Sequence, residues 1–284
     1  MQCIAPLLLL AGSPWLPESP RWLIEKDREE EAIRVLRMFT VGSDGTLDEE
    51  AFAANYSHIR AQIKDEQAAA EHSSKWHLVT KPSLRKRLVC GMATQFVCQS
   101  TGVLVINNYQ VLLYNSLGLY ASVPLLLYAV YLSWAAGMNH VSALIIDKVG
   151  RVRLMAFGLV GCVASIACET AMIAEFSGTP DRVGNGFGVF FLFLFVTFYG
   201  ACLDATSYVY CAEIFPTHHR ATGMGVSIFT QFCTTLVYTQ LAPLAFETIG
   251  WRYYLVFILV PAVGAVVFWC YFPEVGARTL AFLD

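Results

Sequence analysis

The chain has 284 residues, of which 56% are hydrophobic and only 14% charged, and its mean hydropathy is +0.52. An ordinary water-soluble domain has about a quarter of its residues charged, so this composition indicates a protein that lies in lipid. The net charge of −3 argues against a nucleic-acid-binding surface, and the nine cysteines have no spacing typical of a metal or redox site. We therefore expect no nucleic-acid partner, no metal ion and no cofactor.

Residues 1–15 are apolar but short, and they contain Pro6 and Pro14. A signal peptide is the alternative interpretation, but the basic residues that normally precede its apolar segment are missing. We expect this stretch to be the end of a transmembrane helix whose beginning is not in the chain.

Residues 16–87 form a polar segment with two amphipathic patterns. Apolar residues recur at helical spacing in each pattern, which predicts short surface helices rather than a separate globular domain. A solvated charged loop is the alternative. The two stripes are Ala32, Val35, Leu36 and Phe39, and then Phe52, Tyr56, Ile59 and Ile63.

Six later stretches are apolar over about 20 residues, the length that an α-helix needs to cross a bilayer. Backbone polar groups in lipid must bond within their own segment, which favours helices over other structures. We therefore predict an all-α membrane protein, with a six-helix bundle at 88–272 behind the polar linker and a cytosolic tail at 273–284. The six predicted spans are 88–112, 121–146, 154–176, 186–212, 222–246 and 251–272.

Most of the 19 lysine and arginine residues fall on one side of these spans. If the linker lies in the cytosol, alternation of the spans leaves only Arg182 and Arg252 outside. Positively charged residues are enriched in cytoplasmic loops, so we predict a multi-pass protein of the plasma membrane with a cytosolic C-terminus.

Three charged motifs lie at the predicted cytosolic ends of helices, and each combines an acid with an arginine. Such pairs can hold helical bundles together through ion pairs that break when the bundles move, although simple positive-inside anchoring would also explain a single motif. The pairs are Glu18 with Arg21, Asp147 with Arg151, and Glu213 with Arg220.

Together with Glu274 and Arg278 in Pro273–Thr279, these motifs resemble the signatures of the sugar porter family in order and spacing. The resemblance covers essentially the whole chain. Val152 separates two arginines that the family places together, and Val275, Gly276 and Ala277 replace its usual Thr, Lys and Gly.

The resemblance implies two six-helix halves around a central sugar site that opens alternately to either side. Only the second half is present in this chain, so the missing N-terminal half is an expected partner, with a sugar substrate and the lipid bilayer. The family's proton-coupling acid is expected in the missing half.

An uncharged sugar requires amides, hydroxyls and an aromatic face, and the first full span offers them. Gln95, Gln99 and Tyr109 recur at helical spacing with Gly102 between them. Gly102 and the pair Asn107 and Asn108 predict a break in this helix. Packing between helices by buried amides is the alternative role for these residues.

The segment Cys98–Gly102 resembles the family's sugar-binding motif but retains only its second glutamine, Gln99. Leu104 stands where the family has a sugar-contacting asparagine, and Asn108 and Tyr109 stand at a tyrosine pair. By the same resemblance, Tyr208 replaces a stacking tryptophan and Gln231 matches an amide. These departures suggest a divergent sugar site in which Asn107 and Asn108 participate.

Asp204 is an acid near the middle of an apolar span, where the family has glycine. An intramembrane acid is by default a functional hypothesis, here a proton or substrate contact. The alternative is an acid that pairs with an amide and orders the bundle.

We therefore predict transport of a hexose or small oligosaccharide by proton symport, as part of a full-length transporter and without enzymatic chemistry. The spans carry no paired acids, histidine cluster or nucleophile motif. The alternatives are an inactive truncated fragment and a sugar sensor that does not transport.

Overall fold

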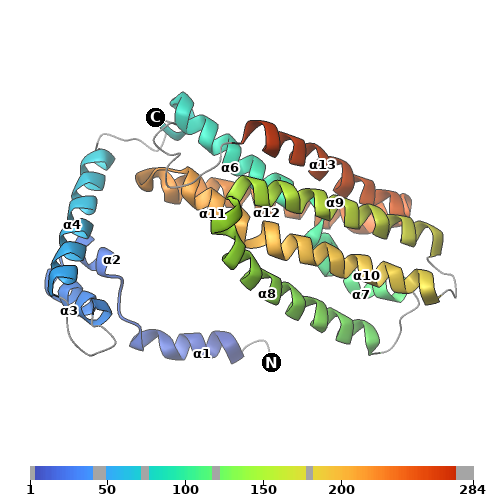
Figure 1. Cartoon of the computed structure of the whole chain (residues 1–284), viewed down its shortest axis with the longest axis horizontal. Helices are drawn as coiled ribbons and strands as arrows, with labels where there is room; N and C mark the ends of the chain where they lie inside the picture. The colour runs from blue at the N-terminus through green and yellow to red at the C-terminus, as the bar shows by residue number, and fades with distance from the viewer. Residues whose placement is uncertain (1–3, 41–48, 72–76, 117–121, 177–181, 273–284) are drawn as a thin grey trace. The chain divides into compact units, whose positions relative to one another are not determined.

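The computed structural model describes residues 4–40, 49–71, 77–116, 122–176 and 182–272, and the described residues form helices and no strand (Figure 1). The chain divides into two compact units, Met1–Ser74 and Lys75–Asp284.

The first unit consists of helices, and three of them, α2, α3 and α4, share a small apolar core. Its elements are α1 (Ile4–Gly12), the 3₁₀ turn η1 (Ser13–Trp15), α2 (Pro20–Glu25), α3 (Glu29–Thr40) and α4 (Glu49–Glu71). Both predicted amphipathic stripes form helices, and they pack on each other and on α2. The core residues are Leu23, Ile24, Ala32, Val35 and Ile63, with Tyr56 and Ile59 against them.

Phe39 departs from the predicted stripe, because its side chain is 70% exposed. It lies in the last turn of α3, outside the core that Ala32 and Val35 share with α2 and α4. The periodicity predicted the helix correctly, but the last turn of α3 extends beyond the apolar core.

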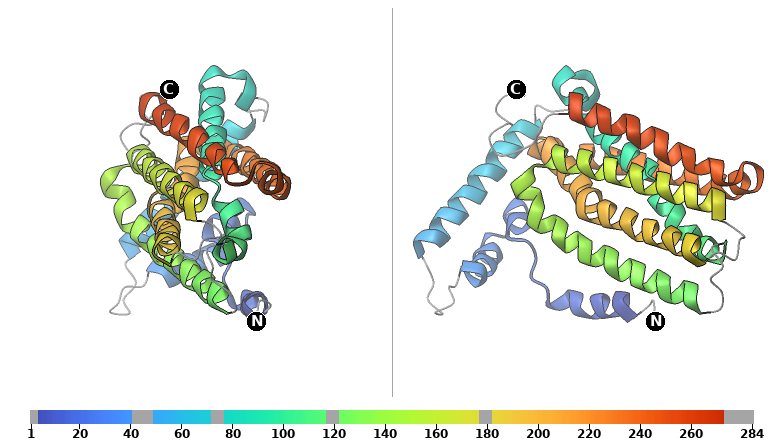
Figure 2. Two further views of the ribbon diagram at one scale, coloured as in Figure 1. Left: turned by 90° about the vertical axis from the view of Figure 1, so that its right-hand side faces the viewer. Right: turned by 45° about the vertical axis from the view of Figure 1, so that its right-hand side comes forward.

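The second unit is a bundle of long helices that run side by side (Figures 1 and 2). Helix α9 packs against α10 and α13, and α6 packs against α12. The elements are α5 (His77–Thr80), α6 (Pro82–Ser100), α7 (Val103–Ser116), α8 (Val123–Val149), α9 (Arg151–Phe176), α10 (Arg182–Tyr199), η2 (Gly200–Asp204), α11 (Ala205–Ile214), α12 (Thr217–Thr248), η3 (Gly250–Tyr253) and α13 (Tyr254–Tyr271).

Five helical stretches are long and apolar enough to cross a membrane: Pro82–Val111, Val123–Val149, Arg151–Phe176, Val183–Ile214 and Gly250–Tyr271. Each coincides with a predicted span. The remaining predicted span, 222–246, lies in α12, which has 32 residues but is not among these five. Hydroxyl and amide side chains lower the hydropathy of α12, and two of them, Gln231 and Thr235, contact side chains of other helices.

The first span starts at Pro82, six residues before the predicted start at 88. Arg85, Lys86 and Arg87 are therefore inside the helix rather than before it. The guanidinium of Arg87 donates a hydrogen bond to the backbone carbonyl of Ile214 at 3.2 Å, which accommodates its charge at the helix end.

The same span is broken at Gly102, as the sequence predicted. Gly102 has φ of +79°, a conformation that glycine adopts without the cost that a Cβ imposes. The Thr101 hydroxyl donates to the carbonyl of Cys98 at 2.7 Å, and α7 restarts with a bond from the Ile106 amide to the Gly102 carbonyl at 2.9 Å. The predicted polar face therefore does not continue as one helix from Gln95 to Tyr109.

Candidate functional site

A polar stripe on α12 forms the centre of the candidate site. Its first member, Gln231, is buried and pairs with Tyr208 of α11. The Tyr208 hydroxyl lies 2.7 Å from Gln231 Nε2 and 3.1 Å from Gln231 Oε1. Two residues that the sequence placed in a sugar site on separate helices are thus in direct contact.

The next members of the stripe, Thr235 and Tyr238, face the end of α6 just before the Gly102 break. The Thr235 hydroxyl donates to Gln99 Oε1 at 3.3 Å. The hydroxyl oxygens of Tyr238 and Ser100 lie 3.1 Å apart. Helix α12 therefore connects both candidate polar groups, one on α11 and one on α6.

Gln95 lies one turn before Gln99 but has different surroundings. Its side chain is fully buried, and its Nε2 lies 3.6 Å from the sulfur of Cys211 on α11. This contact fits the alternative in which a buried amide packs between helices.

The other candidates on this span lie beyond the break, on α7. Asn107 is partly buried, and its Oδ1 has no hydrogen-bond partner in the described part of the chain. Asn108 is exposed. The ring of Tyr109 packs edge-on against Phe246 of α12, with 5.8 Å between the ring centroids.

Asp204 closes a turn of π-helix, Gly200–Asp204, between α10 and α11. Its carboxylate Oδ2 accepts a hydrogen bond from Asn139 Nδ2 of α8 at 2.8 Å. Single π-turns inside α-helices often occur at functional sites, because the extra residue redirects side chains. The contact itself fits the alternative of an amide-paired acid that orders the bundle.

A charged cluster joins three helix ends at one end of the bundle. Arg151, at the start of α9, makes a two-point ion pair with Glu213 of α11, at 3.0 Å from Nε and 3.1 Å from Nη2. Its Nη2 also donates to Asp147 of α8 at 2.7 Å. The sequence predicted these three residues as latch residues in two separate motifs, and the structure brings them together.

The other predicted latch residues are not part of this cluster in the described structure. Arg220 is exposed and lines a cavity of about 500 Å³ with Arg87 and Glu213. Glu18 is exposed and Arg21 is partly exposed, and both belong to the first unit. Glu274 and Arg278 lie outside the described residues.

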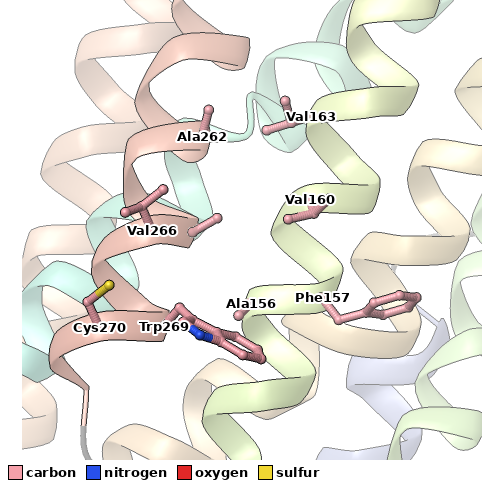
Figure 3. Close-up of a pocket in the computed structure, with 9 residues that line it drawn as sticks. Ala156, Phe157, Val160, Val163, Ala262, Val266, Trp269 and Cys270 are labelled. Carbon is pink, nitrogen blue, oxygen red and sulfur yellow. The ribbon is translucent and has the colours of Figure 1, made fainter.

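A second cavity, of about 470 Å³, lies between α9 and α13 and is lined almost entirely by hydrocarbon (Figure 3). Figure 3 shows the Trp269 ring reaching across toward Ala156. Val160, Val266 and Trp269 are also among the most exposed apolar side chains. This groove is suited to contact with lipid and lacks the hydrogen-bonding groups that a sugar requires.

Sequence reasoning missed several polar residues of the site, namely Thr235, Tyr238, Ser100 and Asn139. The spacing of Gln231, Thr235 and Tyr238, four and then three residues apart, is a signal for one face of a helix. This signal was available in the sequence. The pairing of Asn139 with Asp204 depends on the packing of α8 against η2 and has no such signal.

A family model described as "Sugar (and other) transporter" matches residues 1–284 of the chain. The chain belongs to this family. Members of this family are membrane transporters and not enzymes. With five helices long and apolar enough to span a bilayer in its described part, this chain is a multi-pass membrane protein.

Relatives of this family member are known in fungi and bacteria. The chain is 28% identical over 284 residues to the MFS-type transporter criB of Aspergillus cristatus, covering 100% of the chain and 57% of the relative. It is 25% identical over 301 residues to the high-affinity glucose transporter of Kluyveromyces lactis, covering 100% of the chain and 54% of that protein. The chain thus spans about half the length of the curated relatives that it matches.

Solved structures show the same fold. The proton:xylose symporter XylE, bound to 6-bromo-6-deoxy-D-glucose, superposes with a TM-score of 0.75 at 19% identity, covering 99% of the chain and 57% of XylE. An inward-open structure of XylE from E. coli superposes with a TM-score of 0.66. The bundle of this family member is therefore built as in XylE.

Proposed function

We propose that this chain supplies the second set of transmembrane helices of a sugar transporter and one wall of its sugar site. The substrate class is a hexose or small oligosaccharide, and transport follows alternating access. The observation that carries the proposal is the α12 stripe, in which Gln231 contacts Tyr208 and Thr235 contacts Gln99. Family membership and the glucose transporter among the relatives support it.

This stripe has the chemistry that recognises a sugar. Amides and hydroxyls both donate and accept hydrogen bonds, as sugar hydroxyls do, and the Tyr208 ring offers a face for sugar C–H groups. Tyr208 and Gln231 pair with each other, so each has a hydrogen-bond partner inside the membrane. A sugar would exchange these contacts for its own at a small net cost.

We further propose proton symport across the plasma membrane, with a cytosolic linker at 16–87, a bundle at 88–272 and a cytosolic tail at 273–284. The similarity in fold to a proton:xylose symporter supports coupling to protons. The lysine and arginine distribution supports this orientation. Arg151, Glu213 and Asp147 would then hold the cytosolic ends of α8, α9 and α11 together as the bundle moves.

The test is uptake and binding of labelled hexoses, pentoses and disaccharides in transporter-deficient cells that express the chain with a surface-localisation tag. Gln99→Ala and Gln231→Ala remove the two amides of the stripe. Gln240→Ala is the matched control, because Gln240 is an exposed amide on α12, the helix that carries Gln231. A lost neutral hydrogen bond costs about 0.5–1.5 kcal/mol, so each site variant should weaken binding by roughly 2- to 13-fold.

Uptake that falls in Gln99→Ala and Gln231→Ala but not in Gln240→Ala supports the proposal. Binding without uptake would instead identify a sugar sensor. No binding of any sugar by correctly localised chain would refute a sugar site formed by this chain alone and indicate an inactive fragment.

A further inference from the structure

Glu169 is an acid in the core of the bundle that the proposed sugar site does not use. It lies on α9, and its side chain is 0% exposed. Both of its carboxyl oxygens lack a hydrogen-bond partner in the described part of the chain. An unpaired buried carboxyl of this kind requires a physical explanation, because buried polar groups in proteins are nearly always hydrogen-bonded.

The groups that face Glu169 are uncharged phenols. Tyr114 of α7 and Tyr254 of α13 both interact electrostatically with it, and both are buried. The Tyr254 hydroxyl also has no hydrogen-bond partner in the described structure, while Gln110 Nε2 donates to the Tyr114 hydroxyl at 2.7 Å. Within the described residues, Glu169 forms no ion pair with a lysine or arginine.

An ionised carboxylate in these surroundings would be a buried charge without a counter-ion, which is very costly in a medium of low dielectric constant. A neutral carboxylic acid avoids this cost and gains an O–H that can donate to a phenol oxygen. We propose that Glu169 is a proton-binding site inside the helical bundle, distinct from the sugar site and from Asp204.

The position of Glu169 along α9 gives the proton a short route to one side of the membrane. Arg151 lies 18 residues earlier, about 27 Å away along the helix at 1.5 Å per residue. Phe176, at the other end of α9, lies about 10 Å away by the same measure. Glu169 therefore lies nearer the side of the membrane opposite the Arg151–Glu213 cluster, and we expect its proton to exchange with that side.

If the proposed sugar transport is correct, this site also has a route to the sugar. Helix α7 carries Tyr114, and the same half-helix carries the sugar candidates Asn107 and Tyr109. With Tyr114 of α7 and Tyr254 of α13 beside it, Glu169 suits this arrangement of the bundle only when it is protonated. Loss of the proton would create an unpaired charge, which favours movement of α7 away from this arrangement and weaker sugar binding.

The direct test is infrared spectroscopy of the purified full chain in lipid nanodiscs, with ¹³C in the glutamate carboxyl groups, titrated from pH 4 to pH 10. An exposed glutamate ionises near a pH of about 4.3. We expect a protonated-carboxyl band that persists at pH 7 in the wild type, disappears in Glu169→Gln, and remains in Glu175→Gln. Glu175 is an exposed glutamate on the same helix.

Two results would overturn the proton site: a wild type with no protonated glutamate band at pH 7, or a band unchanged in Glu169→Gln. The wild-type titration decides the question even if Glu169→Gln does not fold. Because this readout requires no sugar, a failure of the proposed transport leaves it interpretable.

Coupling to sugar is tested by the pH dependence of sugar affinity. We expect the wild-type Kd to rise by up to about tenfold per pH unit above the pH at which the band disappears, as binding linked to one proton requires. The Kd of Glu169→Gln should not change over that range. An equal pH dependence in both chains would refute the coupling.

Discussion

Replacing Gly102 by alanine tests the break in the first span, because both the conformation and the space at this residue require glycine. The positive φ of +79° alone costs a residue with a Cβ about 1–2 kcal/mol. An added Cβ would also lie 2.6 Å from the Phe257 ring, closer than any stable contact.

Phe257 has little freedom to move aside. Its side chain is 1% exposed and packs edge-on against Tyr238 at 5.5 Å and Tyr253 at 4.9 Å between ring centroids. Forcing an extra methyl into a packed core costs about 1–3 kcal/mol. Together the two terms predict that Gly102→Ala lowers the free energy of unfolding by about 2–5 kcal/mol.

The assay is thermal unfolding of the detergent-purified chain. At about 2–4 °C per kcal/mol, Gly102→Ala should lower Tm by about 4 °C or more. Gly137→Ala is the matched control, because an added Cβ there meets nothing within 4 Å in helix α8. The reasoning is refuted if Gly102→Ala unfolds at the wild-type temperature. Phe257→Leu should reduce the effect of Gly102→Ala, since the smaller side chain relieves the contact.

The ion-pair cluster and the π-turn give two further predictions. Glu213→Gln should lower Tm more than Asp147→Asn does, because Glu213 is only 34% exposed and binds Arg151 at two points, whereas Asp147 is 74% exposed. Added salt screens these charges, so both decreases in Tm should become smaller as the salt concentration rises. Asp204→Asn should lower the free energy of unfolding by less than about 1 kcal/mol, because asparagine keeps an acceptor for Asn139. Asp204→Ala should lower it by about 1–3 kcal/mol, because alanine removes that acceptor. Equal destabilisation by the two Asp204 variants in thermal unfolding would contradict this account.

The apolar architecture could be predicted from the sequence because hydropathy over about 20 residues is a strong signal. The hydropathy signal was weakest for α12, because residues such as Gln231 and Thr235 contact other helices and lower the mean hydropathy of this helix. The break at Gly102 could be predicted because glycine beside two asparagines is a local signal. The contact of Gly102 with Phe257 could not, because it joins residues far apart in the chain.

The part of the candidate site that lies within the family motifs could be predicted from the sequence. These motifs indicated Gln99, Tyr208, Gln231 and the residues that form the ion-pair cluster, but they gave no partner for any of them. The pairing of Arg151 with Glu213 depends on two helix ends meeting in space. Glu169 could not be singled out from the sequence, because a single acid near a helix end is common and only its burial shows that it is unusual.

The π-turn at Gly200–Asp204 sets the rotational alignment of everything that follows it in this span. Each residue of an α-helix turns the chain by about 100°, so the extra residue rotates α11 relative to α10 by that angle. Tyr208 and Glu213 both lie after this turn, and they meet partners on different helices, Gln231 and Arg151. One extra residue therefore fixes the direction of the Tyr208 ring and of the Glu213 carboxylate together, so neither contact can be rotated without rotating the other.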